Sequence, residues 1–470
     1  MMGYIAPLGD AFVLLIGAVM SIAVIAGAAI TFYRRKRAHL ALSVIVYAAS
    51  ALLILYMMLA GGTAQMSIGG FMLINPFSLF FSLIFTVGIL LVNIIAYAYS
   101  KDYNEFALLA SFALIGMYMV AFSLSLVTIF IGLELAVLPA VFMILLSRKS
   151  LEAAAKLFVA ASLSTALLSF AIVLTYGGSG TVALEQYSGA EILGFAALLF
   201  IVSLGFEASI FPFNVLLPDV YSGPPAHITS MLGGVNKKVG FAALMQVLIL
   251  GFIAYRQAFI LIAVLSVFTM FYGNLVALMQ DNIKRMMAYS SISQAGYIMI
   301  GIAVANAAGI SASLFQIFAH MFIFIGVLAI IAWLEGHGKH KINDIEGLHS
   351  ENRFLSFSLA LLLLSLAGLP FTTGFVGKFL IFLSSINSGM VWLAFLGIIN
   401  SIISIYYYAR VIAKVYTGRR VSRGIKVDRG IAAVVLTCVI ITLVFGIWPL
   451  PLMHITGNAA AALFPAAGAA

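Results

Sequence analysis

Long uncharged apolar segments recur along almost the whole chain, separated by short stretches that are rich in charged residues, glycine or proline. A helix needs about 20 predominantly apolar residues to cross the hydrocarbon core of a bilayer. The pattern therefore predicts about 14 membrane-spanning helices. They are expected at residues 11–33, 40–60, 71–98, 106–122, 124–146, 156–176, 193–211, 225–255, 257–280, 285–305, 311–335, 354–385, 391–416 and 431–453.

Two of the predicted helices are interrupted by residues that break helices. Pro212 and Pro218 break the first, and Gly368 and Pro370 break the second inside 354–385. Irregular backbone at membrane depth is tolerated where protein or a water-filled cavity satisfies the freed polar groups, and paired breaks indicate a transport site. The alternative is that proline and glycine are simply common in membrane helices.

Composition supports an all-α integral membrane protein that forms a single membrane domain over residues 1–470. Of the 470 residues, 64% are hydrophobic and 8% are charged, whereas soluble domains carry about 25% charged residues. The net charge of +9 does not indicate nucleic-acid binding, because the basic residues form short clusters between apolar segments. The single cysteine, Cys438, lies in an apolar segment and is expected to fill space in the core.

Basic residues also predict the orientation, because cytoplasmic loops of membrane proteins carry an excess of Lys and Arg. Almost all of them fall in alternate loops, and the opposite loops offer only Arg256. The clustered positions are Arg34 to Arg37, Lys101, Arg148, Lys149, Lys284, Arg285, Lys339, Lys341, Arg353 and the cluster from Arg419 to Arg429. With an even number of spans, the pattern predicts a multi-pass protein of the cytoplasmic membrane with both termini outside.

Ionisable residues lie inside the predicted helices, where a central charge costs about 2.5 to 3.5 kcal/mol on insertion scales. They are Glu134, Glu207, Lys237, Lys238 and Lys378. Each of them alone could be a structural ion-pair partner. Together with two broken helices, they favour a proton relay.

Burial disfavours the charged form of both carboxylates and lysines, so both types become able to exchange a proton. His320, which follows Gln316 by four residues, could join two ends of such a chain through its two ring nitrogens. The other interpretation of His320 is a hydrogen-bonded packing residue.

The sequence contains no metal-ligand cluster, nucleophilic triad or phosphate-binding loop, so no cofactor or metal is predicted in this chain. Gly177-Gly178-Ser179-Gly180 is interpreted as a loop turn because it does not follow a strand. His337, His340 and His349 lie in a hydrophilic loop, which favours solvation over metal binding.

Several motifs resemble those of the antiporter-like membrane subunits of respiratory complex I and their relatives, the Mrp-type cation/proton antiporters and membrane-bound hydrogenases. The resemblance covers nearly the whole chain. It rests on Gly132-Leu133-Glu134, Ser150-Leu151-Glu152-Ala153-Ala154 with Lys156, Phe211-Pro212-Phe213, Leu217 to Pro225, Asn282 to Ser293, and Ala367 to Phe379. Pro218-Asp219-Val220-Tyr221 and the run from Asn400 to Arg410 are most similar to the N-type subunits of complex I.

This resemblance implies 14 helices built from two inverted repeats, each with a broken helix and a half-channel, at about 106–255 and 257–418, followed by a final helix at 431–453. Glu134 matches the family's ion-pair glutamate, Lys237 its central lysine and Lys378 its exit-side lysine. Lys156 and Lys238 are further relay candidates. The implied partners are the lipid bilayer and the other membrane-arm subunits of a complex I-like assembly.

One position departs from the family pattern. The family usually has a lysine where this chain has Glu207, and a histidine where it has Asn214. Glu207 could share a proton with Glu134. Alternatively, Lys156 or Lys237 supplies the missing positive charge, or this half-channel is inactive.

The sequence thus predicts a proton-translocating, non-redox subunit of a complex I-like quinone oxidoreductase, moving protons through a buried Glu/Lys/His relay. The alternatives are a cation/proton antiporter subunit of an Mrp-type or hydrogenase-linked complex, and a purely structural membrane-arm protein.

Overall fold

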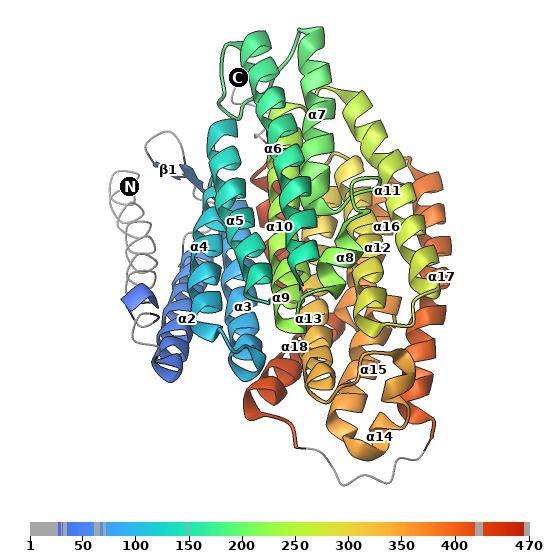
Figure 1. The fold of residues 1–470 in the computed structure, drawn as a ribbon. Coiled ribbons are helices and arrows are strands. Elements are labelled where there is room, and N and C mark those ends of the chain that lie inside the picture. The colour runs from blue at the N-terminus through green and yellow to red at the C-terminus, as the bar shows by residue number, and fades with distance from the viewer. Residues whose placement is uncertain are drawn as a thin grey trace.

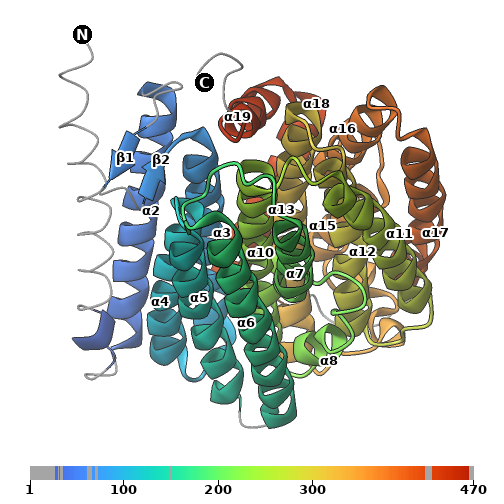
Figure 2. The same cartoon turned by 90° about the horizontal axis from the view of Figure 1, so that it is seen from above.

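Helices account for nearly all of the backbone in the computed structural model, which describes residues 27–29, 31, 35–60, 66–68, 72–147, 150–418 and 426–464. The chain advances from α2 at one edge of the molecule to α17 at the other (Figure 1), and Figure 2 shows the same progression from above. The first half comprises α2 (Lys36–Ala60), the hairpin of β1 (Met66–Ile68) and β2 (Met72–Ile74), α3 (Pro76–Tyr99), α4 (Tyr103–Ala121), α5 (Leu126–Leu146), α6 (Leu151–Ser179), α7 (Glu191–Ala208), α8 (Leu217–Ser222), α9 (Ala226–Thr229), η2 (Ser230–Asn236), α10 (Lys237–Gln246) and η3 (Val247–Gly251). The second half comprises α11 (Arg256–Leu278), α12 (Ile283–Ala303), α13 (Ala307–Gly336), η4 (Ile342–Ile345), α14 (Leu348–Glu351), α15 (Arg353–Ala367), α16 (Thr373–Asn387), α17 (Val391–Tyr416), α18 (Arg429–Ile447) and α19 (Leu450–Ala461).

The helices match the predicted membrane spans closely. By length and composition, ten helices of the described chain could cross a membrane, and α15 and α16 are shorter apolar helices. Together with α12 and the helical run from α9 to η3, they account for every predicted span from 40–60 to 431–453. The predicted span 11–33 lies almost entirely outside the described residues. The prediction of an all-α membrane protein is therefore confirmed.

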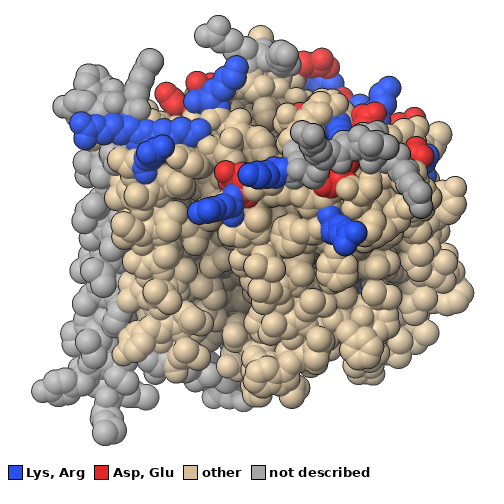
Figure 3. Space-filling model, turned by 90° about the horizontal axis from the view of Figure 1, so that it is seen from below, with Lys and Arg blue, Asp and Glu red and all other residues tan. Residues whose placement is uncertain are grey.

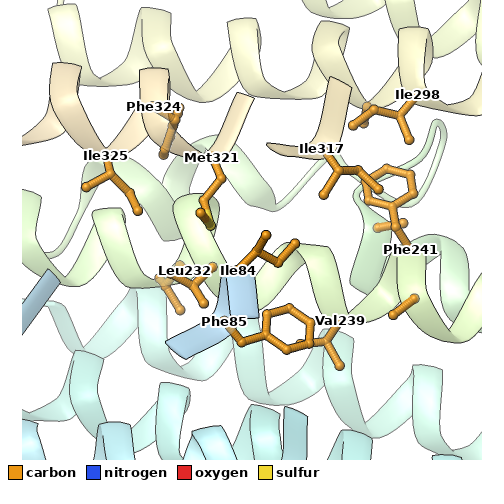
Figure 4. Close-up of a cluster of buried hydrophobic side chains, with 14 of the residues drawn as sticks. Ile84, Phe85, Leu232, Val239, Phe241, Ile298, Ile317, Met321, Phe324 and Ile325 are labelled. Carbon is orange, nitrogen blue, oxygen red and sulfur yellow. The ribbon is translucent and has the colours of Figure 1, made fainter. Parts of the chain in front are cut away.

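Helix α13 is the central element, and it packs against α3, α12, α16, α18 and η2. Its 30 residues are almost all buried, which agrees with the rule that a helix apolar on every side belongs in the interior. Figure 4 shows its side chains meeting those of α3 and η2 in one apolar layer. The residues in this layer include Ile317, Met321, Phe324 and Ile325 of α13, Ile84 and Phe85 of α3, and Leu232 of η2.

Two helix pairs pack backbone against backbone at glycines. A Cβ atom on Gly116 of α4 would lie 2.5 Å from the backbone N of Ala136 in α5, and one on Gly273 of α11 would lie 2.5 Å from the backbone N of Ser293 in α12. Such close approach is typical of membrane helix pairs with small residues at the interface. These pairs hold the same place at the start of the two predicted repeats, a division that stays a prediction.

Both predicted interruptions are present. Helix α7 ends at Ala208, and Ser209 adopts a left-handed φ of 62° before the chain reaches α8. Helix α15 ends at Ala367, Gly368 has a φ of 100°, and α16 begins five residues later. Glycine is the residue that adopts this conformation without strain, which explains why the second interruption falls at Gly368.

The last predicted helix, 431–453, is divided. Helix α18 ends at Ile447, and α19 begins at Leu450 after Pro449. Pro451 stands in the first turn of α19, a position where the missing N–H of proline costs no hydrogen bond. Because this stretch is apolar throughout, the hydrophobic pattern does not predict the division. The positions of Pro449 and Pro451 indicate it.

Charged side chains gather at one end of the molecule, and the surface below them in Figure 3 is uncharged. We use the name basic end for the end of the helices that carries Lys101, between α3 and α4, Lys284 and Arg285, in the first turn of α12, and Lys339 and Lys341, after α13. It agrees with the one-sided pattern in the sequence, although which side of the membrane it faces stays a prediction. Six of the predicted topology residues lie outside the described residues: Arg34, Arg148, Lys149, Arg419, Arg420 and Arg423.

Candidate functional site

Two adjacent buried lysines occupy the start of α10, directly after the π-helical segment η2. The Nζ of Lys237 donates to the backbone O of Ser291 at 2.7 Å and lies 3.2 Å from its hydroxyl. The Nζ of Lys238 donates to the backbone O of Gly233 at 2.5 Å. Adjacent helical side chains point about 100° apart, so the two ammonium groups reach different neighbours.

His320 on α13 is the second neighbour of Lys238, with 2.9 Å between Nζ and Nδ1. The imidazole ring stacks on Phe324 with centroids 5.3 Å apart. Its Nε2 is buried and has no hydrogen-bond partner among the described residues. One ring nitrogen is therefore engaged by a lysine, and the other is available to a second proton-exchanging group.

Glu207 and Lys237 line one small cavity of about 60 Å³, together with Ser209, Tyr221 and Asn236. Glu207 is partly buried in the last turn of α7. Helix α10 comes this close because residue 240 is glycine: a Cβ there would lie 2.7 Å from the Cβ of Glu207. The structure thus brings the unusual carboxylate and the central lysine to the same cavity.

Glu134 occupies an adjoining cavity of about 260 Å³ between α5 and α6. It is partly buried, and the hydroxyl of Thr165 donates to its Oε1. Val137 and Ala161 line both this cavity and that of Glu207 and Lys237. The carboxylates of Glu134 and Glu207 therefore lie in neighbouring cavities that have two lining residues in common.

Lys378 lies at the second break. Its Nζ donates to the backbone O of Leu366 at 2.7 Å, and it lies 3.0 Å from the hydroxyl of Ser401. It also stands 4.7 Å from the ring centroid of Tyr297, within the range of a cation–π contact. Because Leu366 is in the last turn of α15, the ammonium group satisfies a carbonyl that the helix itself leaves unpaired.

A pair of glutamines connects the His320 region with Lys378. The amide of Gln316, one turn before His320 on α13, donates to Oε1 of Gln294 at 2.9 Å. The amide of Gln294 in turn reaches the carbonyl of Leu366 at 3.5 Å, the same oxygen that accepts from Lys378. Gln294 is a site residue that reasoning from charges missed. The signal was the polar run Ser290-Ser291-Ile292-Ser293-Gln294 inside a predicted membrane helix.

Lys156 lies elsewhere. Its Nζ forms ion pairs with Glu152 and Asp219, both at 2.6 Å, and it lines neither the Glu134 cavity nor the Glu207 cavity. Lys156 therefore does not supply a positive charge to Glu207, and Lys237 is the lysine that shares the cavity with this carboxylate. A role for Lys156 in a relay stays a prediction.

The loop histidines make ring contacts: His337 packs on Trp333 and His349 on Tyr416. In the same loop, backbone N–H groups of His340 and Lys341 donate to Asp344 and hold the pKa of this carboxyl below its usual value. No group of three His, Cys, Asp or Glu residues suited to a metal ion occurs in the described part of the chain.

Comparison with known proteins decides the family. Residues 123–404 match the family model described as NADH:quinone oxidoreductase/Mrp antiporter, TM, which is more than half of the chain. The NADH-quinone oxidoreductase subunit N of Desulforamulus reducens is 33% identical over 408 residues, covering 83% of this chain and 86% of that protein. The chain belongs to this family.

Two further relatives widen the picture of the NADH:quinone oxidoreductase/Mrp antiporter family. The F(420)H(2) dehydrogenase subunit N of Methanosarcina mazei is 33% identical, with 83% of this chain and 85% of that protein covered. A chain of respiratory complex I from Thermus thermophilus superposes with a TM-score of 0.84 at 25% identity, covering 94% of this chain and 99% of that chain. The segment 123–404 contains every candidate relay residue named above.

Proposed function

We propose that this chain is a proton-translocating, non-redox membrane subunit of a complex I-like oxidoreductase. Relatives in the same family are named as N subunits of NADH-quinone oxidoreductase and of F(420)H(2) dehydrogenase. The buried lysines Lys237, Lys238 and Lys378 inside membrane-spanning helices support a role in ion transport. The chain's partners are then the other membrane-arm subunits of such an assembly, and the redox chemistry belongs to those partners.

One observation carries this proposal: buried polar groups form a nearly continuous series through the interior from the first break to the second. The series starts at the Glu134 cavity, passes the Glu207 and Lys237 cavity, and continues through adjacent Lys238 to His320. The glutamine pair then leads from the His320 region to Lys378. Ionisable groups are costly in a membrane interior, so a role in ion movement explains their presence.

The proposed mechanism is electrostatic. Lys237 and Lys238 are neighbours in a buried interior of low dielectric constant, where like charges repel far more strongly than in water. A proton that arrives on one lysine therefore promotes release from the other. Lys237 faces the Glu207 cavity and Lys238 faces His320, so this alternation passes protons between the two halves of the chain.

Each remaining residue takes a role from its contacts. Glu207 stores a proton beside Lys237 in their common cavity. Glu134, which accepts a hydrogen bond from Thr165 in the adjoining cavity, changes the electrostatic energy of this proton storage. His320 exchanges protons through its two nitrogens. Lys378, which sits on the carbonyl end of α15, receives protons at the second break.

The test replaces Lys237 with alanine in the intact complex, reconstituted into sealed vesicles. We expect Lys237→Ala to abolish proton pumping while the subunit still assembles, because the other groups keep their contacts. Lys341→Ala is the matched control, since this lysine is exposed at the basic end and lines none of the cavities described here. Undiminished pumping in the Lys237→Ala complex would refute the relay.

Purification of the intact complex distinguishes the two family alternatives. Copurification of quinone-reducing subunits supports the oxidoreductase assembly, whereas cation/proton exchange without a redox partner supports an antiporter. Normal assembly and pumping after Lys237 and Lys378 are neutralised together would instead assign these lysines a structural role.

A further inference from the structure

Two cavities at the basic end meet at a single buried histidine, His227. One cavity of about 220 Å³ is lined by Lys101 and Asp102, and another of about 390 Å³ by Lys284 and Glu335. His227 lines both of them, as do Tyr99, Ser147 and Pro225. Among the residues that line both cavities, His227 is therefore the one with a basic ring nitrogen, beside the phenol of Tyr99.

The position of His227 is fixed from both sides. Only 4% of the residue is exposed, and its ring meets Phe106 edge to face with centroids 5.5 Å apart. The preceding residue, Ala226, is anchored because its backbone N donates to Oε2 of Glu335 at 2.8 Å. Glu335 also pairs with Lys284 at 2.5 Å, so these two charged residues that line the larger cavity neutralise each other.

Despite this burial, Nδ1 of His227 has no hydrogen-bond partner among the described residues. Buried polar atoms are nearly always satisfied, and a polar cavity beside such an atom is where ordered water binds. A packing histidine would be expected to bond a neighbouring carbonyl or hydroxyl. The unsatisfied nitrogen beside two cavities instead fits a group that exchanges protons with water.

His227 also stands at the beginning of the helical run that carries the central lysines. Lys238 follows it by 11 residues, a rise of about 16 Å along a helix. Ser230 lies three residues after His227 and so on the same helical face, and its buried hydroxyl likewise has no partner in the described chain. The carbonyl of Gly233, one turn further, accepts the hydrogen bond from Lys238.

The segment between the histidine and the lysines is π-helical, from Ser230 to Asn236. Such segments are rare and frequently occur at functional sites. Here η2 presents the carbonyl of Gly233 and the buried, unpaired Oδ1 of Asn236 between His227 and the Glu207 cavity. Polar groups therefore occur along the whole distance.

We propose that His227 is the group through which protons pass from the two basic-end cavities to Lys237 and Lys238, by way of Ser230 and water held along η2. In each transfer, one ring nitrogen takes a proton from cavity water and the other releases its own toward Ser230, so the ring returns to the neutral state. This inference rests on the proposed translocation function and assigns the residue at which the path begins.

The first test measures access from each side of the membrane. In a Cys438→Ala background, which removes the single cysteine of the chain, His227→Cys is treated with a membrane-impermeant thiol reagent in vesicles of both orientations. The whole complex is used, and labelling of this chain is read by mass spectrometry. We expect His227→Cys to react only from the side of the basic end.

Two matched cysteine variants calibrate this labelling. Ser203→Cys replaces a fully buried serine and is expected to stay unlabelled from both sides. Ser179→Cys replaces an exposed residue at the end of α6 and is expected to react only from the opposite side. A His227→Cys variant that behaves like either control contradicts the proposal.

The second test measures pumping at equal redox turnover, with imidazole as a chemical substitute for the missing ring. We expect His227→Ala to pump about tenfold more slowly or worse, because a positioned proton-transfer group contributes factors of this size or more. Added imidazole should restore much of the rate, which the loss of a packing residue would not allow. In His227→Phe, which fills the space, imidazole should fail to restore it.

The outcomes separate this inference from the proposed function. Normal pumping in His227→Ala, or a loss that imidazole does not repair, overturns the role of His227. The same preparation of Lys237→Ala then shows whether the relay itself stands. If Lys237→Ala also pumps normally, the proposed function fails; if it alone is inactive, only the entry through His227 is wrong.

Discussion

The two helix breaks have the same backbone form but opposite chemistry. Helices α7 and α15 both end in a left-handed residue, at Ser209 and Gly368. At the end of α15, the ammonium group of Lys378 bonds the carbonyls of the last two residues, at 2.7 and 3.4 Å. At the end of α7, the penultimate residue is itself an acid, Glu207.

This difference matters because the C-terminus of a helix carries a partial negative charge. A cation is stabilised there, and a carboxylate is disfavoured. At the second break, the partial negative charge at the end of α15 is thus compensated by a lysine of α16, the helix that follows it. At the first break, the lysine that lines the same cavity of about 60 Å³ as the carboxylate, Lys237, comes from α10. The two breaks are therefore chemically unequal, and the first is the more sensitive to the position of α10.

The largest effect is expected from Lys378→Met, which removes the cation of the second break and keeps the length of the side chain. The carbonyls of Leu366 and Ala367 lose their charged donor, at a cost of about 1–3 kcal/mol. We expect pumping to be lost and the thermal unfolding temperature of the complex to fall.

Lys414→Met is the control for this change, because Lys414 forms a partly exposed ion pair with Glu346 at 3.4 Å. Exposed pairs contribute about 0–1 kcal/mol, so stability and pumping should stay near those of the unaltered complex. Equal losses in the two variants would show that the second break has no special need for its lysine.

A smaller effect is expected from Gly240→Ala, which alters the spacing of the first break without changing any charge. The added methyl would lie 2.7 Å from the backbone N of Ala208, so α10 must move away from α7. Overpacking of this kind costs about 1–3 kcal/mol. Because Lys237 would move away from Glu207, pumping should fall several-fold while assembly persists, measured in the same vesicles.

Gly177→Ala on α6 tests whether this loss is specific, since no atom lies within 4 Å of the Cβ it would add. It should leave pumping unchanged and can raise helix stability by up to about 1 kcal/mol. Normal pumping in Gly240→Ala would mean that the distance between Glu207 and Lys237 has no role.

The sequence was enough to predict most of the spans in the described chain, both breaks and the ionisable residues inside the helices, because these depend on local composition and on the cost of charge in lipid. It did not reveal which groups meet. The link from Gln316 to Gln294 and the pairing of Lys156 with Asp219 join residues 22 and 63 positions apart. Such pairings depend on how helices pack, and the sequence pattern alone does not determine this.

The smallest effect is expected from Glu207→Gln, which removes the charge of the first break and keeps its shape. Relief of the unfavourable helix-end charge should raise stability slightly, by about 0.3–1 kcal/mol, while pumping falls a few-fold because the cavity loses its proton store. Glu207→Asp, which keeps a carboxyl group, should retain most of the pumping. Stability and pumping therefore move in opposite directions, which a structural role would not produce. Unchanged pumping in Glu207→Gln would show that the carboxylate at the first break has no role in proton transfer. Of the two breaks, only the second, with Lys378, would then contribute to pumping.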